Sequence, residues 1–183
     1  MPVYGEHVVI DLCCGVGGWT DAFLAEGCTV IGYDIRSDKR YVGHLIRADV
    51  RELDGRRFSD VLCIVASPPC DEFSLANPKR RDPAFTPDMS IVEACFRIGR
   101  ESGRPLVLEN VCGAQKFLGA PVGHYGKFYL WGDGVPALLP QGPRWKEKYK
   151  MRSSSRHLRA RIPFELAAAV AHYMVSQAVV EHR

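Results

Sequence analysis

Short apolar runs alternate with amphipathic stretches along the first part of the chain. β-Strands are predicted for five runs rich in Val, Ile and Leu: 7–12, 28–34, 44–50, 59–69 and 104–111. In the run at 59–69 the apolar residues occupy both parities, which is typical of a strand covered on both faces of a sheet. Helices are predicted at 19–27 and 89–103, each ending at a glycine.

Strands that alternate with helical connections indicate parallel pairing. We therefore predict an α/β fold with a single Rossmann-like, doubly wound sheet. The segment 112–143 is rich in Gly and Pro and contains one aromatic run, 126–132, which predicts an antiparallel edge strand and makes the sheet mixed. A last amphipathic helix is expected over 163–182, with Pro163 near its first turn.

The composition is that of an ordinary globular protein and suits one domain, 1–183, with 46% hydrophobic and 25% charged residues. The seven cysteines include no C-x-x-C pair, and no His stands at metal-ligand spacing. This pattern argues against a disulfide framework and a zinc site and favours a reducing, intracellular and cytoplasmic setting. No apolar run approaches a membrane span, and the N-terminus, with Glu6 and Asp11, lacks the pattern of a signal peptide.

One stretch of the chain is strongly basic although the net charge is only +3. Between Arg144 and Arg161, eight Lys or Arg residues accompany a single acid, Glu147. Such a stretch is either a solvated loop or a surface that faces phosphates, because clustered Lys and Arg release counterions when they bind nucleic acid.

Glycines and carboxylates follow the first three predicted strands, where an open α/β sheet binds its ligands. In chain order they are Gly15, Gly17, Gly18, Asp34 and Asp49. The dinucleotide fingerprint G-x-G-x-x-G would need glycine in place of Thr20, so the loop predicts a nucleoside-cofactor site of a related kind. Asp34 stands where such sheets place a carboxylate on ribose hydroxyls. Turn glycines and an aspartate that caps the next helix are the purely structural alternative.

Cys70 comes directly after two prolines at the end of the fourth predicted strand. Pro68 and Pro69 have a fixed φ and no N–H, so they end the strand and stiffen the backbone that holds the thiol. A single cysteine is usually a small buried hydrophobe, but its place before a polar loop favours a nucleophile. Glu109 ends the next apolar strand, where a carboxylate is costly unless it is solvated or functional.

Three motifs, in this order, resemble those of the DNA (cytosine-5)-methyltransferases: Asp-Leu-x-x-Gly-x-Gly-Gly at 11–18, Ser-Pro-Pro-Cys-x-x-Phe-Ser at 67–74 and Glu-Asn-Val at 109–111. The segment 161–174 is similar to the one with which that family closes its chain, whose helix covers the cofactor loop. The resemblance implies S-adenosyl-L-methionine as methyl donor. It also implies cytosine in DNA as target, flipped out of a duplex or presented in a single strand.

The resemblance further implies a role for each matching residue. Cys70 would add to carbon 6 of cytosine, and Glu109 would engage the ring nitrogen and the exocyclic amine. Arg159 and Arg161 would complete the catalytic set by reaching the base and the phosphates; the alternative is that they belong to a generic basic segment. The implied cofactor site comprises Asp11, Cys13, Gly15, Gly17, Gly18, Trp19, Asp34, Ile35, Asp49, Val50 and Pro68.

The chain departs from the family in four places. Asp71 replaces the glutamine that usually follows the catalytic cysteine and should raise the pKa of the neighbouring thiol. Cys13 replaces an aromatic residue. His157 replaces the glutamine that begins a Gln-x-Arg-x-Arg strand. The segment 112–161 leaves no room for a target-recognition region before the closing helix, 163–182. We therefore expect short or relaxed specificity, or a protein partner that supplies recognition.

Two alternatives remain open at the level of sequence. One is a catalytically weak or inactive subunit that binds the cofactor or nucleic acid within a larger methyltransferase assembly. Retention of both Cys70 and Glu109 favours the enzyme, since a binding module needs neither. The other is a nicotinamide-dependent oxidoreductase, against which Thr20 argues.

Overall fold

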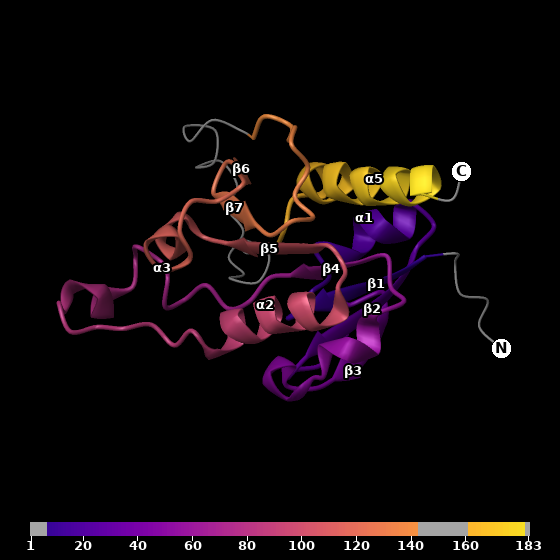
Figure 1. Ribbon diagram of the computed structural model, residues 1–183. Coiled ribbons are helices and arrows are strands. Elements are labelled where there is room, and N and C mark those ends of the chain that lie inside the picture. The colour runs from indigo at the N-terminus through magenta and orange to yellow at the C-terminus, as the bar shows by residue number, and fades with distance from the viewer. Residues whose placement is uncertain (1–6, 143–160, 182–183) are drawn as a thin grey trace.

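The computed structural model describes residues 7–142 and 161–181, and this part of the chain forms a seven-stranded mixed sheet (Figure 1). The strand order is β3-β2-β1-β4-β5-β7-β6. The strands are β1 (Val8–Leu12), β2 (Thr29–Asp34), β3 (His44–Arg47), β4 (Cys63–Ala66), β5 (Leu106–Asn110), β6 (Gly123–Tyr125) and β7 (Phe128–Trp131). Strands β1 to β5 pair in parallel, whereas β7 runs antiparallel to β5 and β6. The prediction of a doubly wound mixed α/β sheet is confirmed, and the run 126–132 contributes an antiparallel strand, β7. The prediction that this run forms the edge is wrong, because β6 pairs with its outer side.

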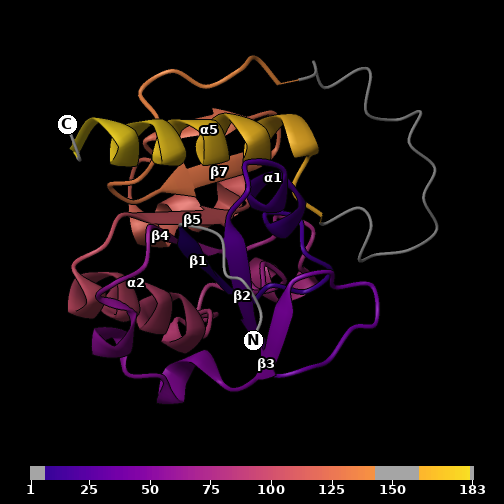
Figure 2. The same cartoon turned by 90° about the vertical axis from the view of Figure 1, so that its right-hand side faces the viewer.

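Helices cover both faces of the sheet. Figure 2 shows α1 (Thr20–Ala25) and α5 (Phe164–Glu181) together on one side and α2 (Ser90–Ser102) on the other. Successive residues of β1 supply the two cores, because side chains alternate across a strand. Val9 packs toward α1 and α5, and Ile10 packs toward α2. All four residues of β4 are buried, as its apolar pattern on both parities predicts.

The connections of β3 differ from the sequence prediction. No helix links β2 to β3, and only two 3₁₀ turns, Val50–Glu52 and Gly55–Phe58, link β3 to β4. Asp49 and Asp54 cap these turns by accepting backbone hydrogen bonds, a local pairing that competes with longer helices. The prediction of helical connections is therefore wrong in this part of the sheet.

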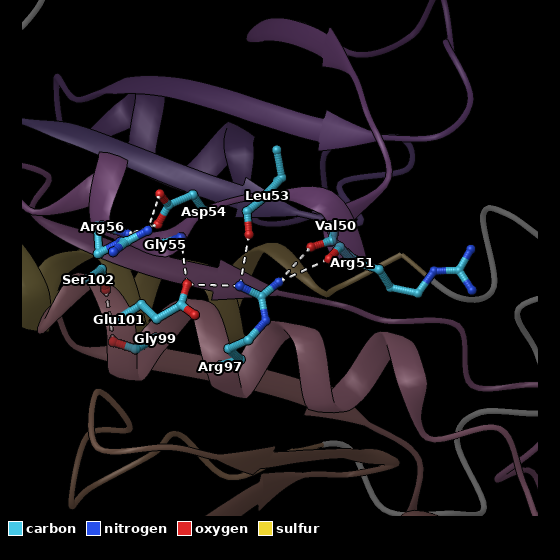
Figure 3. Close-up of polar contacts among 10 residues, drawn as sticks. All are labelled: Val50, Arg51, Leu53, Asp54, Gly55, Arg56, Arg97, Gly99, Glu101 and Ser102. Atoms are coloured by element: carbon cyan, nitrogen blue, oxygen red, sulfur yellow. Dashed lines mark hydrogen bonds and ion pairs between the residues drawn. The ribbon is translucent and has the colours of Figure 1, made fainter.

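Helix α2 is fastened to these turns by two charged side chains (Figure 3). The guanidinium of Arg97 donates to the carbonyls of Leu53 at 2.9 Å and Arg51 at 3.2 Å. Glu101 pairs with Arg97 at 2.8 Å and accepts from the backbone N–H of Gly55 at 2.8 Å. These bonds satisfy turn carbonyls and hold the segment after β3 against the sheet.

Two short elements in the Gly- and Pro-rich segment have no sequence signal: β6 and the single-turn helix α3 (Gln115–Leu118). Three or four residues are too few to show a period. Residues 157–161 stand in place of the family's Gln-x-Arg-x-Arg strand. They lie outside the described residues except for Arg161. Among the helices of 7–142 and 161–181, none combines the length and hydropathy that crossing a membrane requires.

Candidate active site

Cys70 and Glu109 lie at the same carboxyl edge of the sheet, because Cys70 follows β4 and Glu109 lies near the end of the neighbouring parallel strand β5. The register pairs Ala66 of β4 with Leu108 of β5, so the next residues along the two strands are Ser67 and Glu109. The turn after Ser67 then carries Cys70, whose carbonyl accepts backbone hydrogen bonds at 3.1 and 2.9 Å from the residues that close the turn. The structure thus brings together the two residues that the sequence marked for chemistry.

Asn110 locks the two strand ends together. It is fully buried, and its side-chain amide donates to the carbonyl of Pro68 at 3.2 Å, while its side-chain oxygen accepts from Val111 at 2.9 Å. Because Pro68 precedes the cysteine turn and Asn110 follows Glu109, this pair of bonds fixes the thiol relative to the carboxyl group.

Burial dominates the electrostatics of Glu109. The side chain is 8% exposed, and desolvation raises its pKa from 4.5 to about 8, although the charge of Lys127 and a hydrogen bond from Ser67 oppose the rise. Glu109 therefore holds a proton at neutral pH. A neutral carboxyl group can donate a hydrogen bond, which a carboxylate cannot.

The pKa of the half-buried Cys70 thiol is raised, first by desolvation and then by the charges of Glu109 and Asp71. The effect predicted for Asp71 is confirmed in direction. A backbone hydrogen bond and the charge of Lys127 act the other way. When Glu109 is protonated its repulsion disappears, so the neutral carboxyl group favours the thiolate beside it.

Lys127 reaches this edge through the antiparallel pairing of β7. It occupies the tight turn between β6 and β7, and β7 begins beside the end of β5, where Asn110 pairs with Tyr129. The Lys127 ammonium also lies 5.0 Å from the ring centroid of Phe128. Sequence reasoning missed this cation, because only the direction of β7 places it near Glu109.

The loop after Cys70 is anchored by Arg80. Its guanidinium donates to the carbonyls of Phe73 and Gly113, the latter at 3.2 Å, and lies 5.8 Å from the ring centroid of Phe117 in α3. A charge satisfied by two carbonyls and a ring resists displacement. The segment that carries the thiol is therefore held at both ends, by Asn110 and by Arg80.

Asp11 lies buried beneath the glycine loop. One carboxyl oxygen accepts a hydrogen bond from the Thr20 hydroxyl at 2.8 Å, and the other has no hydrogen-bond partner in the described part of the chain. Desolvation raises its pKa from 3.8 to about 7. Because buried polar atoms are almost always paired, the open oxygen indicates a missing donor.

The glycine loop bends toward Asp34 at the end of β2. Gly15 and Gly17 have φ values of +51° and +80°, which glycine adopts without steric cost. The N–H of Gly15 donates to one carboxylate oxygen of Asp34 at 3.0 Å, and Arg36 donates to the other at 2.9 Å. Each oxygen keeps a second lone pair for a ligand hydroxyl, and a Cβ built on Gly15 would meet no atom within 4 Å. Cys13 also has positive φ, +54°, which is unusual for a residue with a side chain.

The remaining residues of the implied cofactor site are spread along the loops. Asp49 is ion-paired with Arg51 at 2.5 Å. Hydrogen bonds from the side chain and the backbone of Arg51 lower the Asp49 pKa to about 2. Val50 is buried, whereas the side chain of Ile35 is exposed. The indole of Trp19 is buried and donates to the Ser67 hydroxyl at 3.0 Å, a partner that sequence reasoning did not find.

The closing helix returns to the glycine loop. A Cβ on Gly18 would lie 2.7 Å from the backbone nitrogen of Ile162, so the two segments touch. Arg161 forms an ion pair with Asp21 of α1. Arg159 lies outside the described residues, and the catalytic role of both arginines stays a prediction. In the described ranges, no group of three His, Cys, Asp or Glu side chains is arranged to hold a metal ion.

The open carboxylate oxygen of Asp11, the clear space at Gly15 and the lone pairs of Asp34 fit a ligand with an ammonium group and a ribose, as S-adenosylmethionine has. Fold and site define an S-adenosylmethionine-dependent methyltransferase. Residues 3–106 match the model of the FtsJ-like methyltransferases, more than half of the chain, and the chain belongs to this family. No curated protein matches it.

One solved methyltransferase shares the fold, and two others show weaker similarity. The Entamoeba histolytica methyltransferase EhMeth is 12% identical, with a TM-score of 0.51 and coverage of 75% of this chain and 56% of that one. The Schizosaccharomyces pombe Dnmt2 methyltransferase is 17% identical, with a TM-score of 0.41 and coverage of 60% and 36%. A Spodoptera frugiperda DNMT2 mutant is 19% identical, with a TM-score of 0.40 and coverage of 61% and 37%. The chain thus spans between about a third and just over half of the length of these proteins.

Proposed function

We propose that the protein methylates carbon 5 of cytosine in DNA through a covalent adduct on Cys70. The observation that carries the proposal is the pair formed by a half-buried thiol and a buried carboxyl group with a raised pKa at neighbouring strand ends. Bound S-adenosylmethionine supplies an electrophilic methyl group on its sulfonium. Asp11 and Asp34 would hold its ammonium and ribose groups.

Cys70 acts first. Carbon 5 of cytosine is a poor nucleophile, so the thiol releases its proton to solvent and the thiolate adds to carbon 6, forming a C–S bond. The electrons of the C5–C6 double bond form a C4–C5 double bond, the electrons of the C4–N3 double bond move onto the ring nitrogen N3, and Glu109 gives its proton to N3. The product is a neutral enamine whose carbon 5 is now nucleophilic. A pKa of about 8 keeps the Glu109 proton in place until this step.

The same residues complete the cycle. Carbon 5 would take the methyl group as the S–CH3 bond breaks, with S-adenosylhomocysteine as the leaving group. The proton on carbon 5 is then lost to a base or water, and that electron pair restores the C5–C6 double bond. The C–S bond breaks and Cys70 leaves as a thiolate. The proton on the ring nitrogen returns to Glu109. The Cys70 thiolate regains a proton from solvent, so atoms and charge balance and the enzyme recovers its starting state.

The base must leave the helical stack to reach a buried carboxyl group. Lys127 lies close enough to Cys70 and Glu109 to shift their pKa values, which supports an anionic ligand at this edge. The side chains of Lys79 and Arg81, on the loop after Cys70, are exposed and suit phosphate contacts. Because no residues are assigned to a recognition region, the protein would recognise only a short DNA sequence, or a protein partner would supply the sequence recognition.

The direct test is transfer of labelled methyl from S-adenosylmethionine to duplex DNA, single-stranded DNA and RNA. Wild type should label DNA, and Cys70→Ala should label none of the three. Cys112→Ala removes another half-buried thiol and should keep its activity. DNA that contains 5-fluorocytosine should trap a denaturation-resistant adduct with wild type only, because fluorine blocks the elimination step.

Each outcome decides one part of the proposal. No labelling by the folded wild type would overturn the enzymatic proposal and favour a binding subunit. Labelling of RNA alone would overturn DNA as substrate. Equal labelling by wild type and Cys70→Ala would overturn the covalent mechanism.

A further inference from the structure

A line of neighbouring side chains leads from the cofactor loop to Glu109. It begins at Trp19, which follows the glycine loop directly and precedes α1. The indole Nε1–H of Trp19 donates to the Ser67 hydroxyl at 3.0 Å, and the indole is 1% exposed. A buried N–H with a single partner has its direction fixed by packing.

Ser67 continues the chain to Glu109. The two residues are neighbours because they extend the paired strands β4 and β5, and the Ser67 hydroxyl acts to lower the pKa of the Glu109 carboxyl group. The backbone of Ser67 is also fixed, since its N–H donates to the carbonyl of Leu12 at 3.1 Å. Ser67 therefore stands between the cofactor loop and the candidate acid.

The chemistry of the three groups sets the direction of the chain. An indole N–H is only a donor, so the Ser67 oxygen accepts from Trp19. A hydroxyl has a single proton, and that proton is left for Glu109. A Ser67 proton donated to one oxygen of the Glu109 carboxyl group would fix that oxygen as an acceptor and leave the carboxyl proton on the other oxygen.

We propose that the Ser67 hydroxyl, held by the Trp19 indole, donates to one oxygen of Glu109. Trp19 and Ser67 are then positioning residues that fix which oxygen of Glu109 carries the proton, and so aim it at the substrate base. The hydrogen-bond chain itself is independent of the reaction, but the aim of the proton rests on the proposed function. The chain also explains the residue types: phenylalanine at position 19 would have no donor, and alanine at position 67 would have no link.

The test measures the titration of Glu109 in the folded protein by infrared spectroscopy of its protonated C=O band. Asp11 is also protonated in part near neutral pH, so Glu109→Gln identifies which band belongs to Glu109. Ser67→Ala should move the midpoint upward by about one pH unit, because it removes a donor that favours the ionised form. Ser67→Thr keeps the hydroxyl and should restore the midpoint. Trp19→Phe should give a smaller upward shift.

Kinetics supply a second readout. Ser67→Ala should lower kcat at least about tenfold and change KM for DNA little, because the carboxyl proton acts only in the transition state. Ser67→Thr should recover most of kcat. Ser176→Ala removes a part-buried hydroxyl of α5 that bonds a helix carbonyl at 2.7 Å, and should change neither readout.

The results separate this inference from the proposed function. An unchanged midpoint for the titration of Glu109 in folded Ser67→Ala would overturn the hydrogen bond from Ser67 to Glu109. A failure of Ser67→Thr to restore the wild-type midpoint would overturn it as well. A shifted midpoint with an unchanged kcat would overturn the aiming role. A shifted midpoint in a protein that methylates nothing would leave the chain in place and overturn the proposed reaction.

Discussion

The side-chain amide of Asn110 donates a hydrogen bond to the carbonyl of Pro68 at 3.2 Å, which joins the strand end beside Glu109 to the turn that carries Cys70. Asn110 is completely buried. The bond is therefore shielded from water, and its loss would leave a buried carbonyl without its partner. This buried hydrogen bond therefore fixes the position of the Cys70 thiol relative to the Glu109 carboxyl group.

Asn110→Ala should lower the free energy of unfolding by about 1–3 kcal/mol, the usual cost of leaving buried groups unsatisfied. Methyl transfer should fall further than stability alone explains, because the cysteine turn is no longer held. Urea denaturation and single-turnover labelling at a temperature where the variant is folded will check both effects. Full activity in a destabilised variant would show that the lock serves stability only.

Glu109→Gln should change how stability depends on pH. The folded pKa of about 8 lies above the ordinary value of 4.5, so between these values the native state holds a proton that the unfolded chain lacks. Stability therefore falls as pH rises through this window, by up to about 1.4 kcal/mol per pH unit.

The amide in Glu109→Gln cannot ionise, so its contribution is constant. The variant should be more stable than wild type at the alkaline end of the window, and this difference should shrink as the pH falls. Thermal unfolding at several pH values will measure the difference. Parallel curves for the two proteins would contradict the raised pKa of Glu109.

Asp11→Asn should separate cofactor affinity from stability. The amide oxygen can still accept from Thr20, but the open position now carries an N–H₂ that repels an ammonium group. We expect at least about tenfold weaker binding of S-adenosylmethionine, which equals about 1.4 kcal/mol, with unchanged or higher stability because no buried charge remains.

Calorimetric titration with S-adenosylhomocysteine will measure the affinity of the Asp11 variant. In wild type the affinity should rise as pH passes about 7, where Asp11 ionises, and the variant should lose this rise. Asp38→Asn changes a carboxylate paired with Arg40 outside the loop and should bind normally. Wild-type affinity in Asp11→Asn would contradict contact with the cofactor.

Gly18→Ala should separate the closing helix from the glycine loop. The new Cβ would lie 2.7 Å from the backbone nitrogen of Ile162, and backbone cannot rotate away as a side chain can. Stability should fall by about 1–3 kcal/mol, as in other overpacked cores, and cofactor binding should weaken because the loop shifts.

Gly27→Ala is the matched control for Gly18→Ala. Gly27 has positive φ with no atom within 4 Å of a built Cβ, so alanine there strains the backbone alone. It should lower stability and leave cofactor affinity unchanged. Equal losses of affinity in both variants would show that the contact with Ile162 is not specific to the loop.

Much of the fold follows from short-range patterns. Apolar runs gave five of the strands, glycines gave the ends of two helices, and the double proline gave the end of β4, because each of these signals acts within a few residues. Motif order also placed Cys70 and Glu109 at one edge, since parallel strands share their carboxyl ends.

The tertiary structure decided which groups surround those two residues. Lys127 reaches Glu109 only because β7 runs antiparallel to β5, and Trp19 meets Ser67 only because α1 folds back over the sheet. Long-range pairing leaves no period in the sequence, and an orientation of a buried side chain depends on neighbours far along the chain. The sequence by itself therefore determined the candidate nucleophile and acid, whereas the structure determined the burial of the acid and the groups that surround it.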